Sequence, residues 1–215
     1  MPRPKTLAVS GGSWLLLLAL AAAPAAAQTV EGRAGPWTVT AFAGWYSGAT
    51  PYTLTGPVSG DVKLASAAEY GVRVGYDVSR RVGVEVAWTG TQPRLVFANS
   101  ALGSIGERHL NTVELAANIS LFQAGPTRLL FVGSIGGAGM PASQGGTNLT
   151  MSPGLAYEIF VTRHVSLRLA GAFRETYGNI GPGDKDAFCD ATGCYAYRTD
   201  FYSNWEASGG LKYAF

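Results

Sequence analysis

The chain has 215 residues, of which 14% are charged and 11% aromatic, and it contains 29 glycines. Charged residues make up about 25% of a typical soluble domain, so this composition lacks the groups that a water-facing surface needs. The formal net charge is only +2. Nucleic-acid binding needs clustered positive charge, so we expect no nucleic-acid partner.

Residues 1–27 have the parts of a secretory signal peptide. Arg3 and Lys5 form the basic start, an apolar stretch follows, and small residues precede a cleavage point after Ala27. Cleavage there would leave residues 28–215 as one outer-membrane β-barrel domain with balanced charge. An uncleaved anchor helix is the alternative, but the apolar stretch is short for a membrane span.

Eight segments alternate between apolar and polar residues, which is the pattern of β-strands with one apolar and one polar face. They are 37–46, 69–78, 82–89, 111–122, 128–138, 149–159, 165–174 and 204–215. Their lengths are close to the roughly 9–11 residues that a tilted strand needs to cross a membrane. Pro153 in the sixth segment predicts a bulge or a shorter strand, because proline cannot donate to a sheet.

The connections between these segments alternate in length. Short ones are 79–81, 123–127 and 160–163, long ones are 47–66, 90–110 and 175–201, and 139–148 is intermediate. Outer-membrane barrels have short periplasmic turns and longer external loops. The alternation therefore predicts that both termini lie in the periplasm.

A soluble eight-stranded barrel would show the same alternation with its apolar face inward. Here the polar face is rich in small residues, which suits the narrow lumen of an eight-stranded barrel better than a water-facing exterior. Large aromatic residues also gather near the strand ends, as in the interfacial belts of membrane barrels. The sequence therefore predicts an all-β, eight-stranded antiparallel up-and-down transmembrane barrel.

The last strand carries a more specific signal. Leu211, Tyr213 and Phe215 alternate on one face, and the sequence stops at Phe215. This arrangement resembles the C-terminal assembly signal of bacterial outer-membrane barrels. Residues 71–86 and 161–170 each read as strand, short polar turn and strand, and they resemble small barrels of the outer-membrane protein A transmembrane-domain and opacity-protein type.

That resemblance implies a protein of the bacterial outer membrane, in contact with outer-membrane lipid and lipopolysaccharide. It also implies an encounter with the barrel-assembly machinery during biogenesis. We expect no cofactor and no metal.

Charged residues fall on the polar faces of the predicted strands. A basic residue that faces lipid near the midplane costs about 2–4 kcal/mol, so these side chains should point into the lumen and pair there. The predicted lumenal charge cluster is Glu69, Arg73, Glu85, Glu114, Glu158, Arg168, Arg174, Glu206 and Lys212.

Hairpin geometry predicts pairs within this cluster. Glu158 falls nearly opposite Arg168 across the turn at 160–163, with Lys212 at a similar depth. Arg174 and Glu206 share a depth near the last long loop, and Arg73 is diagonal to Glu85. Such a cluster would plug a narrow lumen, and the alternative is the gate of a small ion pore.

Cys189 and Cys194 stand close together in the last long connection. In an exported protein this spacing favours a disulfide that closes a small loop. A metal site would need a second Cys/His pair nearby. A calcium site formed by Asp184, Asp186 and Asp190 is a lesser alternative to a solvated loop.

Two motifs could indicate chemistry. His164-Val165-Ser166 resembles the His-x-Ser of lipid A deacylases, but Leu167 and Arg168 replace the Asn and Gly that follow it in that family. Residues 133–139 are rich in glycine, but a phosphate-binding loop needs a following helix. We therefore expect no enzymatic activity.

Two functional hypotheses follow. The first is a structural and surface-interaction barrel whose long loops meet a host or surface ligand. The aromatic residues that would supply contact area are Tyr52, Phe97, Phe188, Tyr195 and Tyr197. The alternative is a narrow channel for ions or small solutes with a charged lumenal gate.

Overall fold

The computed structural model of the protein describes residues 35–55, 60–97, 104–107, 109–139, 148–177, 187–190, 193–198 and 201–215. Side chains are described for all of these except 51–55, 104–105, 187–190 and 193–198. The predicted signal peptide, 1–27, lies outside the described residues and stays a prediction. In the part described, no helix has both the length and the apolar character to cross a bilayer.

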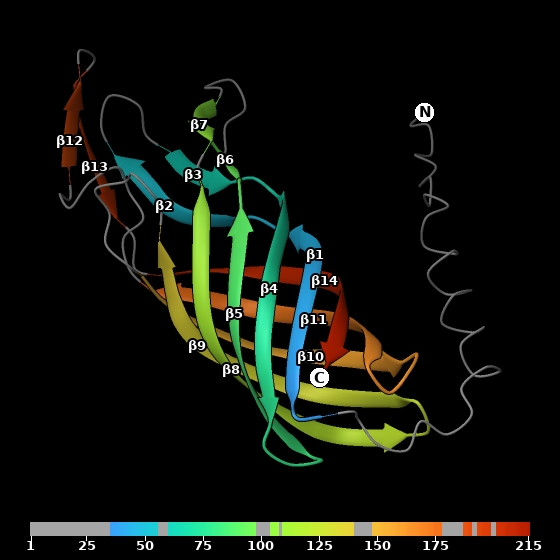
Figure 1. Cartoon of the computed structure of the whole chain (residues 1–215). Coiled ribbons are helices and arrows are strands. Elements are labelled where there is room, and N and C mark those ends of the chain that lie inside the picture. Colours follow the sequence, from blue (N-terminus) through green and yellow to red (C-terminus); the bar gives the residue numbers. More distant parts are fainter. Residues whose placement is uncertain are drawn as a thin grey trace, which may run out of the picture.

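Eight antiparallel strands close into a barrel in the order β1-β14-β11-β10-β9-β8-β5-β4 (Figure 1). They are β1 Trp37–Tyr46, β4 Ala67–Asp77, β5 Val82–Thr91, β8 Leu110–Ala124, β9 Thr127–Gly139, β10 Asn148–Phe160, β11 Val165–Tyr177 and β14 Phe201–Ala214. Each of the eight predicted segments falls on one of these strands. Barrel strands that follow one another in the sequence are neighbours in the barrel wall, so the predicted up-and-down barrel is confirmed.

β10 runs through Pro153 without a break, so the predicted bulge or shorter strand is wrong. Pro153 lies opposite Gly133 of β9 in a continuous register. On the other side, Met151 pairs with Glu175 and Gly154 with Ala172, which is the same offset before and after the proline. Proline removes one donor but allows an extended backbone, so the neighbouring pairs hold the strand straight.

Side-chain hydroxyl groups stabilise two of the short turns. The Ser79 Oγ accepts the backbone N–H of Val82 at 3.1 Å, and the Thr162 Oγ1 accepts that of Val165 at 3.0 Å. Gly125 in the β8–β9 turn has a φ of 52°, in the left-handed region that glycine enters without steric strain. These features make the turns tight.

The two ends of the barrel chain meet at the same rim as these turns. The backbone N–H of Phe215 donates to the carbonyl of Trp37 at 3.0 Å. β1 and β14 pair along their length, from Thr38 opposite Ala214 to Tyr46 opposite Glu206. This pairing closes the barrel, and we call the rim with the short turns the turn end and the other rim the loop end.

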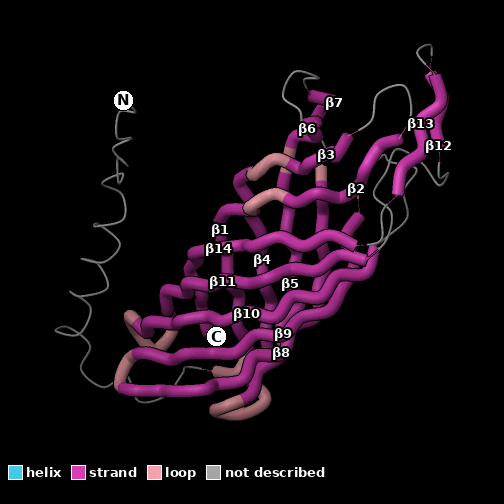
Figure 2. The backbone as a smooth tube through the Cα atoms, turned by 180° about the vertical axis from the view of Figure 1, so that it is seen from behind, coloured by secondary structure: helices cyan, strands magenta, loops and turns pink. Residues whose placement is uncertain are grey.

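The long connections form a second, six-stranded sheet that the sequence did not predict. Its order is β12-β13-β2-β3-β6-β7. The strands are β2 Ala49–Thr55, β3 Gly60–Leu64, β6 Arg94–Phe97, β7 Ser104–Glu107, β12 Ala187–Asp190 and β13 Gly193–Arg198. This loop-end sheet lies beyond the loop end of the barrel (Figures 1 and 2). Its strands are short, and several of them pair with strands from other connections. Alternation along the sequence therefore does not predict them.

The barrel is apolar outside and polar inside. Val86 and Leu115 are 51% and 58% exposed on the outer wall, whereas Glu85 and Glu114 on the same strands are 3% and 6% exposed. A soluble barrel has the opposite arrangement. An apolar outer wall around a polar lumen is typical of a barrel that faces lipid.

Aromatic side chains form contacts on the outer wall near both rims. The pairs are Trp37 with Tyr76 and Tyr213 with Phe215 at the turn end, and Tyr70 with Trp88 and Phe173 with Trp205 at the loop end. Amphipathic aromatic rings prefer the level of lipid headgroups. The two groups match the belts expected at the two interfaces of a membrane.

Candidate functional site in the barrel lumen

Charged side chains fill the lumen at two levels. The turn-end layer consists of Glu85, Arg128, Glu158, Arg168 and Lys212, together with Asn118. The loop-end layer consists of Glu114, Arg174 and Glu206, together with Thr150 and Ser152. Inward strand positions carry all of them, because successive side chains of a strand point to opposite faces.

Glu158 is a fully buried carboxylate of the turn-end layer. Arg128 donates to its Oε2 at 2.6 Å, and the Lys212 Nζ lies 2.9 Å from its Oε1. Lys212 also lies 3.5 Å from Glu85. Lys212 is thus shared by two carboxylates, as expected for buried charges that must be paired.

Arg168 and Glu85 connect opposite walls of the barrel. Their strands, β11 and β5, are four places apart in either direction around the closed order. The Nη1 of Arg168 donates to both carboxylate oxygens of Glu85, at 2.7 and 2.9 Å. Its Nη2 donates to the Oδ1 of Asn118 at 3.1 Å. The side chains of Arg168 and Glu85 together therefore span the lumen.

The hairpin prediction for Glu158 and Arg168 gave their position but not their main partners. The two residues are paired in register across β10 and β11, and their charged atoms lie 3.6 Å apart. The hydrogen bonds of Arg168 nevertheless go to Glu85 and Asn118. A guanidinium on a long side chain reaches across a narrow lumen, which local hairpin geometry cannot anticipate.

Sequence reasoning missed Arg128 and Asn118. Residues 129–132 are apolar on both faces, so the inward face of β9 was ambiguous. Arg128 and Leu130 are two residues apart on β9, so their side chains lie on the same face. Leu130 is 1% exposed, which shows that this face points inward. Asn118 likewise shares a face with Glu114 on β8.

The loop-end layer centres on Arg174. Its Nη1 lies 2.5 Å from Glu206, and its Nη2 lies 3.1 Å from Glu114. The hydroxyl groups of Thr150 and Ser152 donate to the Oε1 of Glu114 at 3.2 and 2.8 Å. Arg174 thus connects β11 with β14 and β8, and it forms a second barrier above the turn-end layer.

Two predicted members of the charge cluster stand apart from these ion pairs. Arg73 stacks on Phe42, with its guanidinium carbon 3.9 Å from the ring centroid. Arg73 lies diagonal to Glu85 in the register of β4 and β5, as predicted, but the ion pairs of Glu85 go to Arg168 and Lys212. Glu69 lies against the backbone of Gly44, with its Oε1 2.7 Å from where a β-carbon on that glycine would sit.

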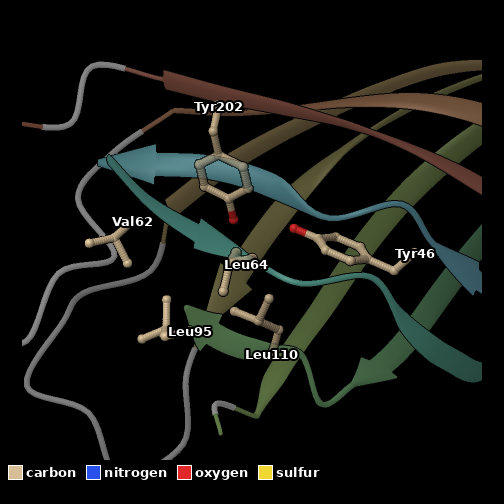
Figure 3. Close-up of a cluster of buried hydrophobic side chains, with 6 residues drawn as sticks. All are labelled: Tyr46, Val62, Leu64, Leu95, Leu110 and Tyr202. Atoms are coloured by element: carbon tan, nitrogen blue, oxygen red, sulfur yellow. The ribbon is translucent and has the colours of Figure 1, made fainter. Parts of the chain in front are cut away.

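An apolar cluster covers the loop end of the lumen (Figure 3). This apolar cap consists of Tyr46, Val62, Leu64, Leu95, Leu110 and Tyr202, each 5% exposed or less. Val62, Leu64 and Leu95 come from the loop-end sheet, and the other three come from the barrel rim. Phe97 packs against the cap, so it is not the exposed contact residue that the sequence predicted.

The remaining predicted residues lie outside the lumen. Leu211, Tyr213 and Phe215 point outward and are 58%, 45% and 62% exposed. Cys189 and Cys194 are directly opposite each other in β12 and β13, but their side chains are not described. Asp184 and Asp186, and the aromatic side chains of Tyr52, Phe188, Tyr195 and Tyr197, also lie outside the described parts.

The motif residue His164 has a structural contact. It lies at the β10–β11 turn, where its Nδ1 is 2.9 Å from the carbonyl oxygen of Ala214. Ser166, in the same motif, is buried on the inward face of β11. Among the described residues, no three His, Cys, Asp or Glu side chains are placed to share a metal ion.

The chain matches no known protein family and no curated protein sequence. Its fold does match solved structures. The outer membrane protein OprG from Pseudomonas aeruginosa is 11% identical, with a TM-score of 0.62 over 86% of this chain and 97% of that one. The outer membrane protein AlkL, solved in DMPC lipid bilayers, is 13% identical, with a TM-score of 0.53 over 88% and 94%.

A third similar structure is Neisserial surface protein A, which is 16% identical with a TM-score of 0.48 over 83% of this chain and 97% of that one. Identities this low establish the fold alone. The closed order of eight strands and the apolar outer wall agree with it. The chain has the fold of the small eight-stranded outer-membrane β-barrels.

Proposed function

We propose that this protein resides in the bacterial outer membrane and acts there as a non-enzymatic surface-interaction barrel. The apolar outer wall and its two aromatic belts support a place in a bilayer. The short turns support a periplasmic turn end, with the loop-end sheet outside the cell. In this orientation the loop-end sheet is the part of the molecule that other surfaces meet.

The observation that carries this proposal is the closed lumen. Arg168 and Glu85 bridge its diameter near the turn end. Arg174 and its two carboxylate partners fill it further along, and the apolar cap covers its loop end. A solute would have to break buried ion pairs and displace packed apolar side chains. The function therefore belongs to the outer surface rather than to a pore.

The loop-end sheet supports a role in contact. It joins segments of three connections into one hydrogen-bonded surface, so less conformational entropy is lost when a partner binds. We propose a host or surface ligand as this partner, with outer-membrane lipid and lipopolysaccharide around the barrel. We further propose that Leu211, Tyr213 and Phe215 serve as the signal for the barrel-assembly machinery.

Conductance measurements test this proposal. The refolded barrel, shown to be folded by its heat-modifiable migration on a gel, should give no current steps in a planar lipid bilayer. Discrete steps from folded wild-type protein would overturn the proposal. An epitope inserted in the 139–148 connection should be detected on intact cells, whereas one inserted in the 123–127 turn should need permeabilised cells.

A narrow ion channel is the second candidate. In the described residues only side chains obstruct the lumen, and side chains can move aside to open a path. Removing the carboxylate of Glu158 takes a shared acceptor from Arg128 and Lys212. If the protein is a gated pore, Glu158→Ala should produce larger current steps than the wild type. Silence in both, from inserted protein, would leave the surface role as the better explanation.

A further inference from the structure

Three buried oxygen atoms near the loop end of the lumen have no hydrogen-bond partner among the described residues. They are the Oη of Tyr46, the Oε2 of Glu69 and the Oδ1 of Asn204. The three residues are only 2%, 3% and 3% exposed. An unsatisfied buried polar atom costs about 1–3 kcal/mol, so three in one region indicate a ligand for oxygen donors.

The pairing register places these residues at one level. Their strands β4, β1 and β14 are consecutive in the barrel wall. Glu69 is paired with Gly44, two residues before Tyr46 on the same face. Tyr46 is paired with Glu206, and the Nδ2 of Asn204 donates to the Oε1 of Glu206 at 3.2 Å. The three oxygen-bearing side chains therefore enter the lumen side by side, beneath the apolar cap.

The close-up of the cap in Figure 3 shows one of these three residues, Tyr46. Figure 3 shows Tyr46 extending inward from β1 with its hydroxyl directed toward Tyr202. The register thus places a phenol oxygen, an amide oxygen and carboxylates at the loop end of the lumen.

Among the described residues at this level, carboxylates outnumber guanidinium groups by three to two. The carboxylates are Glu69, Glu114 and Glu206, and the nearby guanidinium groups are Arg73 and Arg174. Arg174 forms ion pairs with both Glu114 and Glu206, while the guanidinium group of Arg73 stacks on the ring of Phe42. Among the described residues, Glu69 forms no ion pair within salt-bridge distance, in contrast to Glu114 and Glu206.

We propose that the oxygens of Tyr46, Glu69 and Asn204 bind a monovalent cation, Na⁺ or K⁺, inside the barrel. Carboxylate and carbonyl oxygens are the donors that hard cations prefer. A single positive charge matches the single unpaired carboxylate. The ion would coordinate lone pairs of three buried oxygen atoms that otherwise have no partner among the described residues, and it would offset the charge of Glu69.

This site lies at the seam where the barrel closes. β1 and β14 are the first and last barrel strands, and β4 is the next neighbour of β1. A ligand that binds only the folded protein stabilises it in proportion to its concentration relative to the Kd. The cation should therefore hold the closing seam together and raise the unfolding temperature.

Thermal unfolding in detergent micelles tests the site. The folded fraction of the refolded protein would be measured in NaCl, KCl and tetramethylammonium chloride at equal ionic strength. We expect a saturable rise of several degrees in the midpoint with Na⁺ or K⁺ and none with the bulky cation. Glu69→Gln should abolish this dependence. The control Glu107→Gln, which removes an exposed carboxylate paired with Arg94, should retain it.

A second variant keeps the test decisive if Glu69→Gln does not fold. Tyr46→Phe removes one oxygen and keeps the ring of the apolar cap, so the salt titration should shift to several-fold higher Na⁺ concentration. If the unfolding midpoint of the wild type is the same in all three salts, water or a proton on Glu69 satisfies the buried oxygens. That result would overturn the proposal. Unchanged ion dependence in both variants would place the ion elsewhere and overturn it as well.

Discussion

Arg168 reaches across the full width of the barrel to Glu85, and the Nη1 of its guanidinium lies 2.7 and 2.9 Å from the two carboxylate oxygens. Arg168 is 2% exposed and Glu85 is 3% exposed. This pair joins strands on opposite walls, so it closes the lumen and also ties the cylinder together.

Removing one partner of that pair should destabilise the folded barrel. Arg168→Met leaves Glu85 buried with Lys212 as its remaining cationic partner, and breaking a buried ion pair in this way costs about 3–5 kcal/mol. The free energy of unfolding would be measured by urea titration in lipid vesicles. The control Arg163→Met, at an exposed turn position, should change it by less than about 0.5 kcal/mol. Equal effects of both variants would contradict the bridging role.

Gly44 should be intolerant of a side chain. A β-carbon there would lie 2.7 Å from the Oε1 of Glu69 and 2.8 Å from the β-carbon of Ser208. Overpacking of this kind costs about 1–3 kcal/mol, so Gly44→Ala should lower the urea midpoint. Gly139→Ala on β9 meets nothing within 4 Å and serves as the matched control. A loss of stability in the control alone would show that the lumen near Gly44 is looser than described.

A charge on the outer wall should be tolerated only near a rim. Val86 lies in the middle of β5, and Val78 lies just beyond the end of β4; they are 51% and 61% exposed. In a lipid bilayer Val86→Arg should cost about 2–4 kcal/mol, while Val78→Arg should cost about 0–1 kcal/mol. The measurement is the unfolding free energy of each variant in vesicles. Equal, small losses would indicate that this wall faces water.

The β12–β13 hairpin should carry a disulfide in the exported protein. Cys189 and Cys194 occupy directly opposed positions in register, and directly opposed strand residues have β-carbons about 4.5–5.5 Å apart, near the spacing of a disulfide. Mass spectrometry of protein purified without reductant should find the two cysteines linked. Protein in which a thiol reagent modifies both cysteines before reduction would contradict the bond.

The sequence alone determined the barrel strands and, for all of them except β9, which face points outward. Alternation from Trp37 to Trp45, or from Val113 to Leu121, is a local property of each strand, and side chains of one parity must share a face. A lipid-facing wall then requires the apolar parity outside. For the same reason the charges at Glu85, Glu158 and the other inward positions could be placed in the lumen.

Only the tertiary structure decided which of these groups meet. Arg168 takes Glu85 rather than its hairpin neighbour Glu158 as its main partner, and Arg128 supplies the missing cation, because contacts across the lumen depend on how the strands are staggered when the barrel closes. The loop-end sheet has the same origin, since several of its strands pair between connections that are distant in the sequence. Local periodicity cannot encode such pairing, because it contains no information about which distant strand stands opposite.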